Sequence, residues 1–305
     1  ELDAELDSQR LSGRISDRDE ALRLLLSVSG TLTEREQRIG LSGSVFGFDL
    51  AALGVSPEPI GGSFALDASA SAAGKGAYAA RIALDSIEIR NKHRTDRIRP
   101  TSVSLHTDSA ATRAEAASGH LSLTFSTPQS ADSLIAALTR SARALAGQID
   151  AQSIDMEQLK PALPDFALRV SAGPDNILNS LLKSRKIAFD ALNSEGANCD
   201  SLPVSIRLRT EGLAYGNVVL DTVTADIRQN GKRLEYALGL ANAPGNLDNI
   251  ARAGLYGHLV RNTGQANLYQ RNRAGREGFR FGLDVTWTDS LVRASVTPPD
   301  PLFGF

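Results

Sequence analysis

The sequence Phe279-Arg-Phe-Gly-Leu-Asp-Val-Thr-Trp287 alternates strictly between apolar residues and residues that are polar or glycine. Because successive side chains on a β-strand point to opposite faces, the apolar residues share one face, and Arg280, Asp284 and Thr286 lie on the other. An amphipathic helix would instead repeat its apolar residues every three or four positions. The stretch therefore predicts a strand of roughly 30 Å whose apolar face needs a cover.

The same alternation runs from Pro203 to the C-terminus. Asn230-Gly231 separates two alternating runs, and this pair is preferred in type I′ turns, so it predicts a hairpin. The predicted register pairs residues of one apolar face: Ile227 with Leu234, Ala225 with Tyr236, and Val223 with Leu238.

On the other face of this hairpin, the predicted register sets like charges opposite each other. Arg228 falls opposite Arg233, and Asp226 falls opposite Glu235. Directly opposed like charges destabilise a sheet unless water and diagonal neighbours screen them. This face is therefore expected to be solvated.

The N-terminal part also reads as antiparallel strands, with alternating runs that begin near Leu2, Leu11 and Leu22 and recur as far as His106. A helical region follows between Ser130 and Lys183. Its helices are marginal in water when isolated, so their apolar stripes are expected to pack on strands. The leucines expected to be buried are Leu134, Leu138, Leu145, Leu178 and Leu182. The predicted segments are 1–128, 129–200 and 201–305, with the first and last continuous in one sheet.

Composition narrows the function. The net charge is −2, which provides no field to recruit nucleic acid or anionic lipid headgroups. Cys199 is the only cysteine, so an internal disulfide framework is excluded. The first residues have neither the basic nor the apolar part of a signal peptide, and no run has the length of a membrane span. The chain is expected to be a segment of a longer protein.

No reaction chemistry is found. Ser180-Leu-Leu-Lys183 matches a Ser-x-x-Lys nucleophile pattern, but it falls within a predicted helix and no Lys-Thr-Gly partner occurs. The histidines are scattered and none has a second metal ligand at helical or turn spacing. They are His93, His106, His120 and His258. The expectation is a protein that is not an enzyme, with no catalytic residues, no metal and no cofactor.

A short pattern recurs at irregular intervals: a small or apolar residue, any residue, glycine, any residue, and an apolar residue. Its occurrences begin at Leu11, Leu41, Ile60, Ala117 and Leu255. Glycine inside a strand permits bending and bulging, which a sheet needs if it is to curl.

These glycine-containing strands, the turn Phe46-Gly-Phe-Asp-Leu-Ala-Ala-Leu-Gly54 and the C-terminal run resemble the bacterial AsmA-like and TamB proteins, and the tail Thr297-Pro-Pro-Asp-Pro-Leu-Phe-Gly-Phe305 is similar to TamB chains of the Bacteroidota type. The resemblance implies an internal fragment of a periplasmic protein that is anchored in the inner membrane by a segment absent here. It implies a long antiparallel sheet curled into an open half-pipe with an apolar interior. The helical region departs from that pattern.

The resemblance further implies a role in outer-membrane biogenesis, with phospholipid acyl chains bound and conducted along the groove and an outer-membrane assembly-barrel protein as a possible partner. The residues expected to line the groove are Val204, Ile206, Leu208, Val223, Ile227, Leu234, Tyr236, Leu238, Leu240, Phe279, Phe281, Leu283, Val285 and Trp287. Inward alternation is equally compatible with a closed β-sandwich. Two other functions therefore stay open: an assembly factor that pairs its edge strands with β-proteins, and an extracellular sandwich for binding or adhesion.

Overall fold

The structure is a computed structural model that describes residues 1–74, 76–92, 94–183, 185–199, 202–242, 251–288 and 291–299. The predicted fold class is confirmed: the chain is mainly β, with 65% of its residues in strands and 12% in helices, and its long antiparallel sheet is not closed. The chain divides into two compact units. Unit 1 comprises Glu1–Ala131 and Asp175–Ser184, and unit 2 comprises Asp132–Pro174 and Arg185–Phe305.

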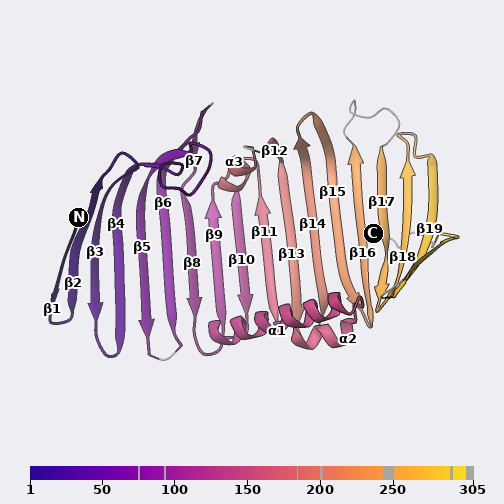
Figure 1. The fold of residues 1–305 in the computed structure, drawn as a ribbon, viewed down its shortest axis with the longest axis horizontal. Helices are drawn as coiled ribbons and strands as arrows, with labels where there is room; N and C mark the ends of the chain where they lie inside the picture. The colour runs from indigo at the N-terminus through magenta and orange to yellow at the C-terminus, as the bar shows by residue number, and fades with distance from the viewer. Residues whose placement is uncertain are drawn as a thin grey trace. The chain divides into compact units, whose positions relative to one another are not determined.

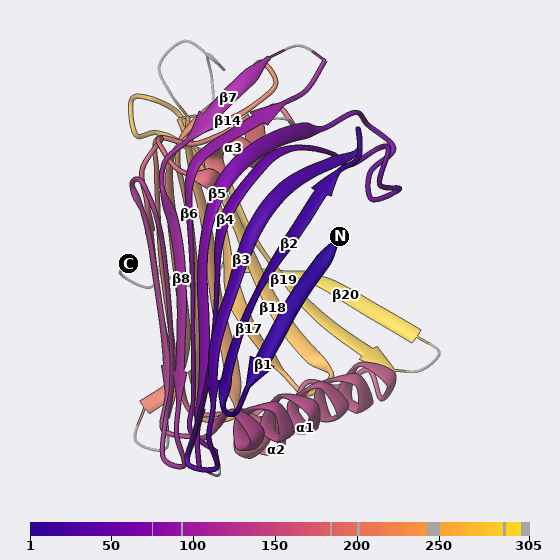
Figure 2. The ribbon, with the colours of Figure 1, turned by 90° about the vertical axis from the view of Figure 1, so that its left-hand side faces the viewer.

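Unit 1 is an antiparallel meander with one short helix. Its strands are β1 (Leu2–Asp7), β2 (Arg10–Arg18), β3 (Leu22–Leu32), β4 (Glu36–Asp49), β5 (Gly61–Ala73), β6 (Tyr78–Arg90), β7 (Thr95–Ile98), β8 (Thr101–Thr107), β9 (Thr112–Ser118) and β10 (Leu121–Thr127), and its helix is α3 (Ile177–Lys183). Each strand pairs with the next, except that β6 pairs with β8 along its first part and with β7 along its last. Figure 2 shows that β2 to β5 bend along their length.

Unit 2 begins with helices and continues as a second meander. Its helices are α1 (Ala131–Asp150), which starts at the last residue of the first segment of unit 1, α2 (Met156–Leu159) and the 3₁₀ turn η1 (Lys160–Ala162). Its strands are β11 (Phe166–Ala172), β12 (Ile187–Ala188), β13 (Ala191–Cys199), β14 (Leu202–Tyr215), β15 (Val218–Asn230), β16 (Arg233–Asn242), β17 (Arg252–Val260), β18 (Thr263–Arg271), β19 (Glu277–Thr288) and β20 (Leu291–Thr297).

Within each unit the strands form one layer, not the two packed layers of a β-sandwich (Figure 1). In unit 2, β13 pairs with β11 and β14, and every later strand pairs with its neighbour in sequence as far as β20. The alternative of a closed sandwich is therefore wrong for the described part of each unit.

The hairpin of β15 and β16 forms, but its predicted register is wrong by two residues. Asn230 pairs with Arg233, so the turn residues are Gly231 and Lys232, and only Gly231 has a positive φ, +60°. That is the pattern of a type II′ turn, which has glycine first. Ile227 now faces Tyr236, and Ala225 faces Leu238. Because the shift is even, the apolar residues keep their face.

The corrected register removes the predicted clash of like charges. Arg228 pairs with Glu235, and their side chains form a salt bridge of 2.8 Å. Asp226 faces Ala237 on β16 and is paired with Arg207 of β14 at 3.3 Å. Opposite charges across strands stabilise a sheet where like charges destabilise it, so the electrostatics of this face favour the observed register.

Helix α1 forms as predicted, but it buries a different face. Ala137 and Ser141 are buried, and Ser141 Oγ donates a hydrogen bond of 2.6 Å to the carbonyl of Ala162. The predicted burial of Leu138 and Leu145 is wrong, because these side chains are 51% and 42% exposed. Small residues allow a close approach of the backbone, so α1 packs through them and leaves its leucine stripe at the surface. Leu134, Leu178 and Leu182 are half-buried.

Two glycines of the recurring pattern show different roles. Gly257 lies within β17, as predicted, and a Cβ there would collide with the carbonyl of Gln265. Gly119 lies outside any strand, in the turn between β9 and β10, with a φ of +55°. The expectation that the glycines of this pattern lie inside strands is therefore wrong at Gly119, where glycine instead provides the left-handed backbone of a tight turn.

Candidate functional site: the apolar face of unit 2

All the residues predicted to line a groove fall on one face of the sheet in unit 2. Directly paired residues of antiparallel strands share a face, so the register can be followed from strand to strand. Leu238 of β16 pairs with Leu255, Leu255 pairs with Leu268, and Leu268 pairs with Phe281 of β19. Phe281 therefore shares a face with Leu238.

The same face extends in the other direction through β15 to β14. Tyr236 pairs with Ile227, and Ile227 pairs with Ile206. Val204, Leu208, Val223, Leu234 and Leu240 follow at even spacings on these strands, and Phe279, Leu283, Val285 and Trp287 do so on β19. We call this surface the apolar face of unit 2.

The residues predicted to line a groove include none from two strands of this face. β17 and β18 separate β16 from β19 and contribute Leu255, Leu259 and Leu268 to the same face. The available signal was the alternation Leu255-Tyr-Gly-His-Leu259, which drew attention for its glycine rather than for its leucines. The apolar face is therefore continuous from β14 to β19.

The apolar face is exposed on β14, β16 and β19. Ile206 is 43% exposed, Leu238 is 43% exposed and Phe279 is 47% exposed. Leucine, isoleucine and phenylalanine are among the residues most often buried in folded proteins, and large contiguous apolar patches are rare on soluble monomers. An uncovered apolar surface across several strands is typical of a binding surface.

The opposite face of the sheet in unit 2 carries several cross-strand salt bridges. Arg207 pairs with Asp226, Arg228 with Glu235, and Arg169 with Glu195 at 3.1 Å. Burial raises the pKa of Glu235, but hydrogen bonds from Asn230 and Arg228 lower it by more, so that its pKa lies below the usual value. This face suits water, as the alternation predicted.

The helices cover only one end of the apolar face. Met156 and Leu159 of α2 pack with Val204 of β14 in a small core that Leu234 of β16 also contacts. Val204 is accordingly buried, with 8% of its surface exposed. Figure 1 shows α1 and α2 along one end of the strands of unit 2 rather than across their middle. The cover is therefore local.

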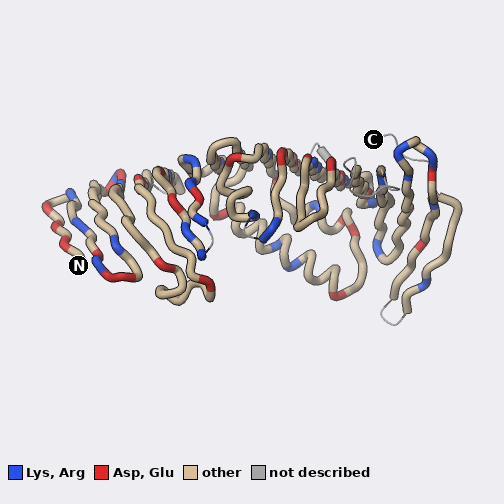
Figure 3. Tube along the Cα trace, turned by 90° about the horizontal axis from the view of Figure 1, so that it is seen from above, with Lys and Arg blue, Asp and Glu red and all other residues tan. Residues whose placement is uncertain are grey.

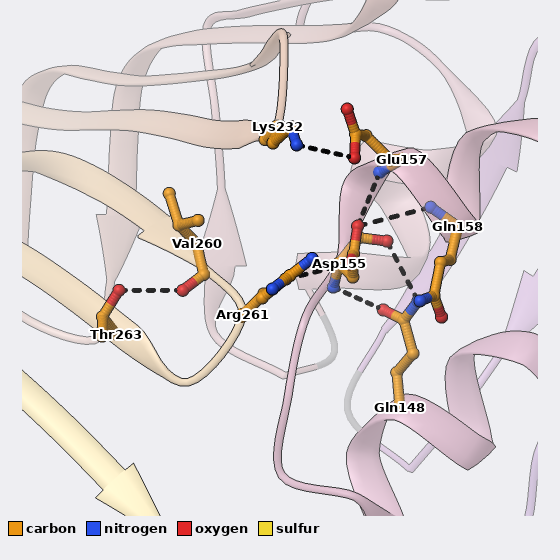
Figure 4. Close-up of polar contacts among 8 residues, drawn as sticks. All are labelled: Gln148, Asp155, Glu157, Gln158, Lys232, Val260, Arg261 and Thr263. Atoms are coloured by element: carbon orange, nitrogen blue, oxygen red, sulfur yellow. Dashed lines mark hydrogen bonds and ion pairs between the residues drawn. The ribbon is translucent and has the colours of Figure 1, made fainter.

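A polar latch holds these helices to the sheet (Figure 4). The backbones of Ile154 and Arg261 exchange two hydrogen bonds, of 2.9 and 2.8 Å, and the Arg261 guanidinium forms a salt bridge of 3.2 Å with Asp155. The amide of Gln148 both donates to and accepts from the Asp155 backbone at 3.0 Å. Lys232, in the β15–β16 turn, adds a salt bridge of 3.2 Å to Glu157.

Asp155 is the centre of the latch. It is the N-cap of α2, and its carboxylate accepts hydrogen bonds from the backbone N–H groups of Glu157 and Gln158. Burial raises the pKa of Asp155, but the hydrogen bonds from these N–H groups and from Arg261 lower it by more. The pKa of Asp155 therefore lies below its usual value. The ionised carboxylate therefore stabilises the folded latch.

Trp287 joins the latch to the apolar face. Its indole Nε1–H donates a hydrogen bond to the carbonyl of Gln152, between α1 and α2, while its backbone bonds to Asn262. The predicted groove residue Trp287 thus has one anchored polar edge, and its ring stays on the side of the apolar face. Tyr236 also has an anchored polar group, because its hydroxyl donates a hydrogen bond of 3.0 Å to the carbonyl of Gln265. Burial raises the pKa of this hydroxyl.

The described part of the chain contains no group of three or more His, Cys, Asp or Glu that could hold a metal ion. Ser180 and Lys183 lie in α3 of unit 1. His106 lies in β8, His120 between β9 and β10, and His258 in β17, whereas His93 and the tail residues 300–305 lie outside the described residues. Among the helices that are described, none has the length and hydropathy needed to cross a membrane.

Comparisons with protein families, with curated proteins and with solved structures found no match to this chain. The fold and the candidate site nevertheless define a class of protein. Unit 2 is an open antiparallel β-sheet with one apolar face, one charge-paired face and a helical cap latched to one end.

Proposed function

We propose that the apolar face of unit 2 binds the acyl chains of phospholipid, and that the chain is a fragment of a periplasmic envelope-biogenesis protein that conducts lipid between the inner and outer membranes. The proposal rests above all on the exposure of Ile206, Leu238 and Phe279 on the apolar face. The resemblance of the sequence to AsmA-like and TamB proteins supports the periplasmic location and the lipid.

The dimensions of the face suit acyl chains. From β14 to β19 the face is roughly 24 Å wide at the usual strand spacing of about 4.8 Å. One acyl chain crosses half of a hydrocarbon layer of about 30 Å. Each methylene group that leaves water contributes about 0.8 kcal/mol, so one chain laid on this face gains several kcal/mol without any polar contact. Such binding is additive along the chain and selects weakly among lipids.

The test measures lipid bound to the purified protein and to a delipidated sample given phosphatidylethanolamine. Native mass spectrometry should find lipid on the unaltered protein and much less on Leu238→Asp. Thr224→Asp is the matched control. Thr224 lies on the polar face of β15 directly opposite Arg209, whose positive charge attracts a carboxylate. Equal lipid on all three proteins, or none on the unaltered protein, would show that the apolar face does not bind acyl chains.

A second candidate function, strand addition to a β-protein partner, is favoured by one observation. Among the described strands β20 pairs only with β19, and its Val292 and Val296 are 68% and 76% exposed. A strand that is paired on one side only, and that has exposed apolar side chains, is a template for another strand. Protection of the β20 amides from hydrogen exchange by an outer-membrane β-protein, with no lipid bound, would favour this function over lipid binding.

A further inference from the structure

The polar face of unit 1 has a shallow cavity of about 420 Å³ that lies over β4, β5, β6, β8 and β9. Its charged lining consists of three arginines, one histidine and one glutamate. These residues are Arg38, Arg81, Arg113, His106 and Glu115. The remaining lining residues are serines, alanines and one leucine.

The strand register brings these groups together in two neighbouring rows. In one row Arg38 pairs with Ser71, Ser71 with Ala79, Ala79 with His106, and His106 with Arg113. In the other row Ser69 pairs with Arg81, Arg81 with Ser104, and Ser104 with Glu115. Directly paired residues share a face, so all the charged groups project from the same side of the sheet.

The serines and alanines between the arginines leave the space that forms the cavity. Arg81 and Arg113 lie on strands two spacings apart, roughly 10 Å at about 4.8 Å per strand. Ser104 of β8 lies between these two strands and pairs directly with Arg81. The small residues are therefore the floor of the cavity, and the arginines are its walls.

The charges of this cavity are incompletely neutralised within the structure. Arg38 is held by Glu36 at 2.7 Å, whereas no salt bridge or side-chain hydrogen bond among the described residues involves Arg81 or Arg113, although the charge of Arg113 acts on Asp108 and lowers its pKa. Asp108, near Arg113 in the β8–β9 turn, directs its carboxylate to the backbone N–H groups of Ala110 and Ala111 at 2.7 and 2.8 Å. Glu115 is the one acidic residue in the described lining.

The cavity lining holds three arginines and one glutamate, whereas the chain as a whole is nearly neutral. The net charge of the whole sequence is −2, and Figure 3 shows basic and acidic residues interspersed along the strands. In unit 2, Arg207 and Arg228 of the polar face have carboxylate partners across the strands, whereas Arg252 lies directly opposite Arg271. What distinguishes Arg81 and Arg113 from the other arginines of the sheet is the hollow that they flank.

We propose that this cavity binds a phosphate group, with Arg81 and Arg113 as its principal ligands and Arg38 at its rim. The planar guanidinium offers paired N–H donors that match the oxygens of a phosphate in a bidentate arrangement. The phosphate is either a free anion or the headgroup of a phospholipid. This proposal is independent of acyl-chain binding, because the cavity is built by the polar face of unit 1.

The experiment titrates the full chain with inorganic phosphate and pyrophosphate by calorimetry, and in parallel with vesicles of phosphatidylcholine, with or without phosphatidic acid. The double variant Arg81→Gln/Arg113→Gln should bind about tenfold more weakly or worse, because two charge-assisted contacts are lost. Both side chains are exposed, so the fold should be retained. Arg14→Gln is the matched control: Arg14 is an exposed arginine of the same polar face, on β2 outside the cavity.

Glu115→Gln should change the affinity for phosphate in the opposite direction. Removing this carboxylate from the lining should tighten phosphate binding a few-fold, because a repulsive charge is lost. Binding of the soluble anions identifies free phosphate as the ligand, whereas binding only of vesicles that contain phosphatidic acid identifies the headgroup. The proposal is overturned if no form of phosphate binds, or if the arginine double variant binds as well as Arg14→Gln.

Discussion

Replacing Leu238 with Asp distinguishes an open apolar face from a closed core. Leu238 is 43% exposed and lies between Ala225 of β15 and Leu255 of β17. Fully burying a leucine contributes about 1.5–3 kcal/mol, so the half-buried Leu238 contributes about 1–2 kcal/mol to the free energy of unfolding. The new carboxylate keeps its contact with water and escapes the larger penalty for burying a charge.

Val204→Asp is the matched comparison on the same face. Val204 is only 8% exposed and packs with Met156 and Leu159 in a small apolar core. A carboxylate there loses the valine's burial and adds a desolvation penalty of several kcal/mol. The total is a large part of the roughly 5–15 kcal/mol that stabilises a typical domain.

The assay is urea unfolding followed by circular dichroism and by the emission of Trp287. Leu238→Asp should lower the free energy of unfolding by about 1–2 kcal/mol and keep a cooperative transition. Val204→Asp should unfold at a far lower urea concentration, or fail to fold. If Leu238→Asp is as damaging as Val204→Asp, the middle of the face is covered in solution and the reasoning from its exposure is refuted.

Two further predictions concern the backbone and the latch. Gly257→Ala should destabilise the protein by about 1–3 kcal/mol, because the new Cβ would meet the Gln265 carbonyl and lie 2.9 Å from the Tyr236 hydroxyl. Gly147→Ala in α1 should stabilise the protein by about 0.5–1 kcal/mol, because the new Cβ meets no atom within 4 Å. Equal effects of the two variants on urea unfolding would contradict this contrast. Because the folded pKa of Asp155 is lowered, its stabilisation is fully present above the unfolded pKa of about 3.9 and is lost as the pH falls through the folded value. Asp155→Asn should therefore reduce the fall in the free energy of unfolding between about pH 5 and about pH 2. If the free energy of unfolding of this variant falls with pH as steeply as that of the unaltered protein, the latch does not depend on this charge.

The period of the sequence predicted much of the candidate site. Alternation is a local property, and side chains two residues apart on a strand share a face whatever lies beside them. The apolar residues of each strand could therefore be assigned to one face of that strand, whereas the match of these faces between strands depends on the register. The error in the β15–β16 hairpin left this assignment intact, because the register moved by two residues rather than by one.

Other features depended on contacts that no local pattern contains. In α1 the leucine stripe gave the stronger signal, yet the helix packs through Ala137 and Ser141 because their small side chains let it approach Ala162 closely. The latch joins Asp155 to Arg261, and the unit 1 cavity joins Arg81 to Arg113 across β8. These pairings bring together residues far apart in sequence, so composition and spacing do not specify them.

The sequence by itself thus determined that the chain is mainly antiparallel β and that apolar and polar residues separate onto the two faces of its strands, since both follow from the two-residue repeat of a β-strand. Only the tertiary structure decided which register β15 and β16 adopt, which side of α1 is buried and how much of the apolar face stays open. These depend on the total energy of cross-strand charges, close backbone contacts and helix packing, and that balance exists only once the strands are side by side.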